Sequence, residues 1–141
     1  MPKKKSIKGS ANEFKAETDK ILAFLTASAG LGDEHVSWCH DLAIIRLYRA
    51  FESLMLDALV GALNNDTSTL SSRTGFAFPK HLTDEVCRFL VTGRGYFDFK
   101  GRDGLIKTLK QYLPDEHYLV DIVSKPGYRG PLERFTAARN Y

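Results

Sequence analysis

Arginines recur near the end of the chain, at Arg129, Arg134 and Arg139. An arginine keeps its positive charge at physiological pH, and its planar guanidinium can donate two parallel hydrogen bonds to a phosphate. Arg139 is followed directly by Asn140 and Tyr141, which adds an amide and an aromatic ring. Such a group suits the binding of RNA, although the simpler interpretation of Arg139 is a surface arginine stabilised by the dipole at the end of a helix.

Metal chemistry has one weak candidate in the sequence. His35, Cys39 and His40 are residue types that bind zinc, and they lie within one short segment. No second cluster completes a set of four ligands, so we interpret them as core or surface residues and expect no metal and no cofactor. Cys39 and Cys87 are too few for a disulfide framework and are expected to be free thiols.

The elements that would position these residues are helices. The spacing of apolar residues predicts an all-α, up-and-down bundle of four to six helices joined by long loops. Residues 1–10 are expected to be a flexible basic arm, and residues 11–141 a single domain. The predicted helices cover residues 11–28, 34–63, 83–91, 103–113 and 117–124, and a last one begins near Pro131. Thr83 is the expected cap of the helix at 83–91.

The segment 34–63 is the clearest of these helices. Apolar side chains recur at steps of three and four from Trp38 to Leu59, and further apolar residues widen the stripe. We therefore expect this helix to lie at the centre of the bundle, covered over much of its circumference. Asp33 is its expected N-cap, and residues 64–80 are expected to form a long loop.

Two motifs on these helices resemble the HEPN superfamily. Its C-terminal motif helix carries an arginine followed four to six residues later by a histidine, and Arg139-Asn140-Tyr141 is similar to the start of that motif. The segment Leu47-Tyr48-Arg49-Ala50-Phe51-Glu52 resembles the aromatic and glutamate pattern on the second helix of the RiboL-PSP group of HEPN proteins. The resemblance covers about residues 11–141. The motif histidine would follow Tyr141, and the last helix has no stop signal, so we expect it to be incomplete.

The resemblance implies a metal-independent endoribonuclease. In such an enzyme the 2′-hydroxyl of RNA attacks the adjacent phosphorus, histidine transfers protons near neutral pH, and arginine stabilises the charge that develops on the phosphate. The implied catalytic residues are Arg139, Asn140 and Glu52, and the implied RNA-binding residues are Arg134, Arg129, Tyr141 and Arg49. Without the histidine, the chain of 141 residues is expected to be inactive or severely impaired.

Glu52 has two interpretations. The resemblance implies a carboxylate that faces the motif helix and orients Arg139 or Asn140, whereas a structural ion pair with Arg46 or Arg49 explains it equally well. A buried carboxylate with no partner is too costly to be a third.

The resemblance also implies partners. HEPN proteins pair their motif helices across a homodimer, bind RNA, and act with a cognate antitoxin or a nucleotidyltransferase-type protein, in toxin–antitoxin or antiphage settings. The alternative function is a non-catalytic HEPN module that binds RNA or such a protein. Composition agrees with a cytoplasmic protein, because no apolar run is long enough for a membrane span and no signal peptide is evident. Four lysines, Lys3, Lys4, Lys5 and Lys8, account for more than the net charge of +3, so the basic balance belongs to the N-terminal arm.

Overall fold

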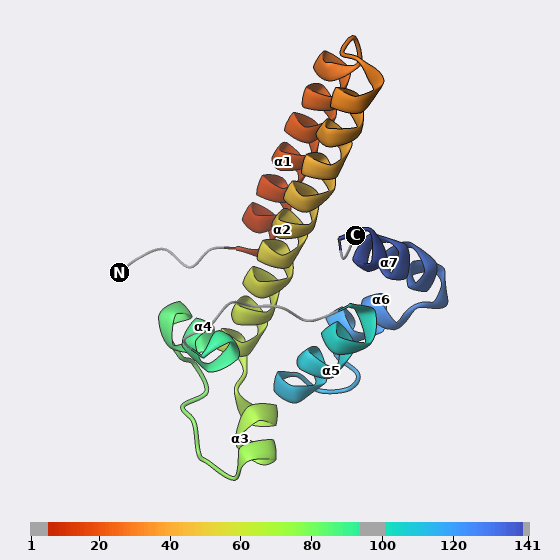
Figure 1. Cartoon of the computed structure of the whole chain (residues 1–141). Helices are drawn as coiled ribbons and strands as arrows, with labels where there is room; N and C mark the ends of the chain where they lie inside the picture. The colour runs from red at the N-terminus through yellow and green to blue at the C-terminus, as the bar shows by residue number, and fades with distance from the viewer. Residues whose placement is uncertain (1–5, 94–100, 140–141) are drawn as a thin grey trace.

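The computed structural model describes residues 6–93 and 101–139, and these residues are almost entirely helical. They form seven helices and no strand, which confirms the all-α prediction (Figure 1). In chain order the helices are α1 (Ile7–Ser28), α2 (Asp33–Asn65), α3 (Ser68–Thr74), α4 (Asp84–Thr92), α5 (Arg102–Tyr112), α6 (Tyr118–Ser124) and α7 (Pro126–Arg139). None of the helices in this part of the chain is both long and apolar enough to cross a bilayer.

The first two helices form a long antiparallel hairpin. α1 begins at Ile7, earlier than the predicted start at residue 11, because the Ser6 hydroxyl accepts a hydrogen bond from Gly9 N at 2.9 Å and caps the first turn. Part of the expected arm is therefore helical. Ser10, in that added turn, is buried and donates a hydrogen bond from Oγ to Asp57 Oδ2 at 3.1 Å. This bond ties the start of α1 to α2.

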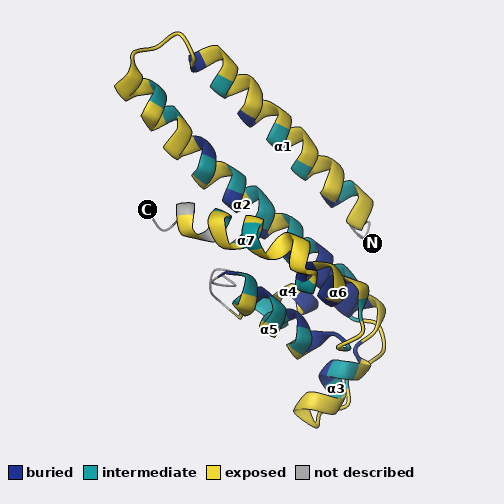
Figure 2. Ribbon diagram, turned by 90° about the vertical axis from the view of Figure 1, so that its right-hand side faces the viewer, coloured by how far each residue is buried: buried dark blue, intermediate teal, exposed yellow. Residues whose placement is uncertain are grey.

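The core surrounds the C-terminal half of α2. Leu59 and Leu63 of α2 are fully buried, and they belong to one cluster with Leu105 and Leu109 of α5. The N-terminal half of α2 contacts α1 on one side and projects away from the other helices (Figures 1 and 2). The expectation of a central helix covered over much of its circumference is therefore wrong for this half, where Trp38 is 57% exposed.

Two local predictions also fail. Residues 64–80 contain the short helix α3, which ends at Gly75 in a left-handed conformation with φ of 76°. The last helix begins at Pro126 instead of near Pro131, so Pro131 lies inside it. Proline suits a first helical turn, but inside a helix it leaves the carbonyl four residues earlier without a backbone donor. Contacts of α7 with α2, α5 and α6 stabilise the helix despite this loss.

Side-chain hydrogen bonds cap α4 and α6, whereas α2 has a glycine at its N-cap. Thr83 accepts a bond from Val86 N at 3.3 Å and caps α4, as predicted. The N-cap of α2 is Gly32 and not Asp33, as had been predicted. Asp33 lies in the first turn of α2, where the positive end of the helix dipole stabilises its negative charge. 

Candidate functional site

The two helices that carry the predicted motifs cross each other. α7 lies across α2 (Figure 2), and Phe135 of α7 contacts two aromatic rings of α2. Its ring centroid is 5.0 Å from that of Tyr48 and 5.8 Å from that of Phe51. These separations are in the range at which aromatic rings attract each other. The tertiary structure thus places side by side two segments that are far apart in the sequence.

Glu52 lies at this crossing. It follows Tyr48 by four residues on α2, so the two side chains share a face of the helix. Its side chain is only 4% exposed, and Met55, one turn further along, is also buried. An ionised carboxylate is costly to bury without partners. A buried glutamate beside a neighbouring helix is therefore a candidate functional residue. Of the two arginines expected as alternative partners, Arg46 is exposed and pairs with Glu17 at 3.8 Å, and Arg49 is exposed as well.

The predicted catalytic arginine is the last residue of α7. Arg139 follows Phe135 by four positions, which is about one helical turn. The helix that contacts α2 through Phe135 therefore carries the backbone of Arg139 just beyond the contact. Asn140 and Tyr141 lie outside the described residues.

The predicted RNA-binding arginines lie in different surroundings. Arg129 donates a hydrogen bond from Nε to Glu133 Oε1 at 2.9 Å, and this carboxylate raises the pKa of the guanidinium. Arg134 and Arg49 are exposed, and neither makes an ion pair with the rest of the described chain. Arg49 is on α2, one turn before Glu52, and Arg134 adjoins Phe135 on α7. These two are therefore the cations nearest to the crossing in sequence and remain available to a ligand.

All four histidines are distant in sequence from the residues at the crossing. The hydrogen bonds of three of them are made to other segments. His35 and His40 are in the first turns of α2, where His40 Nδ1 is 2.8 Å from a carbonyl oxygen of the same helix. His81 bonds to the end of α2, and His117 caps α6 by accepting a hydrogen bond from a backbone N–H at 3.2 Å. Burial lowers the pKa of His117. Each of the last three histidines thus has a local structural contact.

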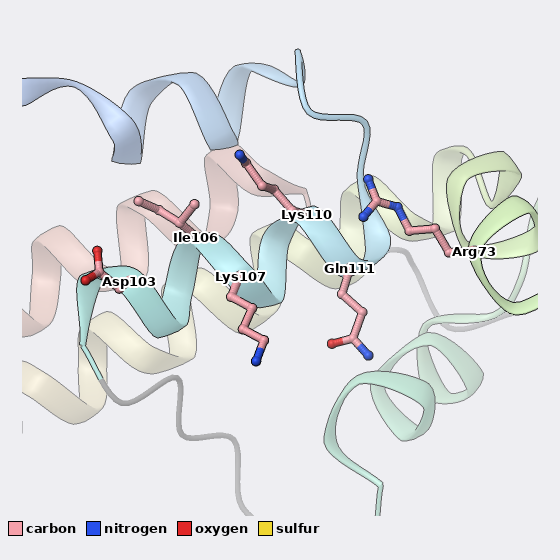
Figure 3. Close-up of a pocket in the computed structure, with 6 residues that line it drawn as sticks. All are labelled: Arg73, Asp103, Ile106, Lys107, Lys110 and Gln111. Atoms are coloured by element: carbon pink, nitrogen blue, oxygen red, sulfur yellow. The ribbon is translucent and has the colours of Figure 1, made fainter.

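A surface pocket of about 550 Å³ lies between α3 and α5 (Figure 3). Its lining includes Lys107 and Lys110 of α5, and Arg73 of α3 extends toward it. Arg73 also pairs with Asp115 at 3.2 Å, and Asp103 lies at the far end. These residues were not predicted as a site from the sequence, although the spacing of Lys107 and Lys110 by three places them on one helix face. The mixed charge makes this pocket a weaker candidate than the crossing.

Within the described ranges, no three histidine, cysteine, aspartate or glutamate side chains gather where they could hold a metal ion. No protein-family model matches the chain, and comparisons with curated proteins and with solved structures return no match. Membership of the HEPN superfamily therefore stays a prediction that depends on the two motifs.

Proposed function

We propose that this chain is a HEPN-type domain of a metal-independent endoribonuclease that acts on RNA in the cytoplasm, and that the 141 residues are inactive by themselves because they lack the motif histidine. The observation that supports this most strongly is the crossing of α7 and α2. The two motif segments were selected from the sequence separately, and Phe135, four residues before Arg139, packs on Tyr48 and Phe51.

In the proposed mechanism, Arg139 stabilises the extra negative charge on the phosphorus as the 2′-hydroxyl attacks. Glu52 orients Arg139 or Asn140, because a fixed carboxylate holds a guanidinium or an amide in one geometry. Arg49 and Arg134 bind neighbouring phosphates on the two sides of the crossing. In the family motif the acid–base histidine would stand after the position of Tyr141, and the histidines at positions 35, 40, 81 and 117 take no part in this mechanism.

Two tests separate this proposal from its alternative. The coding sequence after the Tyr141 codon should supply a histidine four to six positions beyond Arg139. Protein that includes this histidine should cleave single-stranded RNA in the presence of EDTA and leave 2′,3′-cyclic phosphate ends, and Arg139→Ala should abolish the cleavage. Cleavage that is unchanged in Arg139→Ala would show that the site lies elsewhere.

The alternative is a non-catalytic module that binds RNA or a protein such as a nucleotidyltransferase or an antitoxin. It is favoured because the hydrogen bonds of His40, His81 and His117 join them to α2 and α6 and not to α7. Fluorescence anisotropy with a labelled RNA measures binding without cleavage. Arg49→Ala and Arg134→Ala should each weaken binding and reduce the slope of log affinity against log salt by about one. Lys15→Ala, which removes an exposed charge from α1, is the control and should leave the slope unchanged.

A further inference from the structure

The pocket between α3 and α5 is lined mainly by the outward face of α5. The described residues of the lining are Arg73, Asp103, Ile106, Lys107, Lys110 and Gln111. Asp103, Lys107 and Gln111 are spaced by four residues, so their side chains share one face of the helix. Leu105 and Leu109 lie on the opposite face and are buried in the core. The core thus fixes α5 in place, and the helix presents its polar face to the pocket.

Cations outnumber carboxylates in this lining. Arg73, Lys107 and Lys110 are positive, and Asp103 is the one carboxylate among the described lining residues. Neither lysine forms an ion pair with another described residue. Arg73 donates a hydrogen bond from Nη2 to Asp115 Oδ1 at 3.2 Å, and a guanidinium has further N–H donors for a ligand. The pocket is therefore suited to an anion.

The positive groups lie on two sides of α5. Figure 3 shows the guanidinium of Arg73 and the ammonium group of Lys110 on one side of the helix, and the side chains of Lys107 and Gln111 on the other. A ligand that lies across α5 therefore meets positive charge at each end, which matches two anionic groups on one short molecule. Phosphate groups suit these partners, because a guanidinium donates two parallel hydrogen bonds to phosphate oxygens and a lysine supplies a point charge.

The other lining residues favour hydroxyl groups between the two phosphates. Asp103, at one end of the pocket in Figure 3, repels an anion but accepts hydrogen bonds from hydroxyls, and the amide of Gln111 both donates and accepts. None of the described lining residues is aromatic, whereas nucleic-acid bases are commonly held by stacking on aromatic rings. The volume of about 550 Å³ is in the range of small-molecule sites.

We propose that this pocket binds a small polyol that carries two phosphate groups, such as a sugar bisphosphate. One phosphate lies between Arg73 and Lys110, the other is held by Lys107, and the hydroxyls bond to Asp103 and Gln111. This site shares no residue with the crossing of α2 and α7. The proposal goes beyond RNA cleavage and does not depend on it.

Isothermal titration calorimetry of the 141-residue chain tests the ligand class, with fructose 1,6-bisphosphate as the probe. It should bind at least about tenfold more tightly than fructose 6-phosphate, because loss of one phosphate removes charge-assisted hydrogen bonds. Fructose should not bind, and ADP should bind more weakly than the bisphosphate because the lining offers no ring for its base. Absence of binding of the bisphosphate at millimolar concentration, or tighter binding of ADP, would overturn the proposal.

Substitutions of the cations locate the site. Lys107→Ala and Lys110→Ala should each raise the Kd of the bisphosphate at least about fivefold. Arg73→Lys, which keeps the charge but loses the planar fork, should raise it about threefold. The matched control is Lys15→Ala, which removes an exposed lysine from α1 and should leave the Kd unchanged. Equal effects of Lys15→Ala and Lys107→Ala would show general charge attraction and reject the pocket. Circular dichroism confirms that the variants fold.

Asp103→Ala tests the hydroxyl contact. Pyrophosphate has two phosphate groups but no polyol, so the ratio of its Kd to that of fructose 1,6-bisphosphate measures what the hydroxyls contribute. This ratio should fall at least about threefold in Asp103→Ala, because the variant loses an acceptor for hydroxyls and a charge that repels pyrophosphate. An unchanged ratio would exclude the polyol. These measurements use no RNA, so failure of the ribonuclease proposal and failure of this site are distinguishable.

Discussion

Phe135→Ala should destabilise the protein, because this side chain holds α7 on α2. Replacing a fully buried phenylalanine with alanine costs about 3–5 kcal/mol, and Phe135 is half-buried, so the expected loss is about 2 kcal/mol. Urea denaturation followed by circular dichroism measures the free energy of unfolding directly, and thermal unfolding should show a fall of about 6 °C in Tm. The neighbouring exposed residue supplies the control, since Arg134→Ala should change stability by less than about 0.5 kcal/mol.

A double-mutant cycle with Phe51→Ala isolates the contact between the two rings. The centroids of Phe51 and Phe135 are 5.8 Å apart in an edge-on arrangement, for which a coupling of about 1 kcal/mol is expected. Coupling near zero, or a loss below about 0.5 kcal/mol for Phe135→Ala alone, would refute the argument that this ring fixes the crossing. If the crossing is the site, the same substitution should also lower RNA binding.

Three further predictions concern stability alone, and urea denaturation measures each of them. Asp57→Asn should cost about 1 kcal/mol, because Asp57 is bonded to Arg88 at 2.9 Å, and the same change should cost less when Arg88→Ala is already present. Burial lowers the pKa of His117 below 6.5, so the unfolded state binds more protons than the folded state. The free energy of unfolding should therefore fall as the pH falls below about 6.5. His117→Asn should remove that part of the pH dependence. Gly75→Ala should cost about 1 kcal/mol, because φ is 76° there, whereas Gly30→Ala, whose added methyl would meet no atom within 4 Å, should be nearly neutral.

Helices with strong local signals were predicted well from the sequence. The predicted segments 83–91 and 103–113 differ by only one residue at each end from α4 and α5. Thr83 was predicted as the cap of α4, and its hydroxyl accepts a hydrogen bond from Val86 N. Caps and the helical period depend on residues within one or two turns of each other, so a short segment contains the information.

Local signals also produced the errors. The last helix was predicted to begin near Pro131, after a turn at Pro126 and Gly127, yet α7 begins at Pro126. The missing hydrogen bond at Pro131 is offset by packing of α7 on α2, α5 and α6, which no local pattern encodes. Helix α3 was missed because its polar residues show no apolar period, although Leu70 is buried in the core.

By itself the sequence determined that the chain is helical, that Glu52 lies on a long amphipathic helix and that Arg139 lies on the last helix. Only the tertiary structure decided that these two helices cross at Phe135, and that the core covers just the later half of α2. An apolar stripe shows that a face needs a partner, but it does not specify which one. That choice depends on contacts between segments far apart in the chain, and these are fixed only when the whole chain packs together.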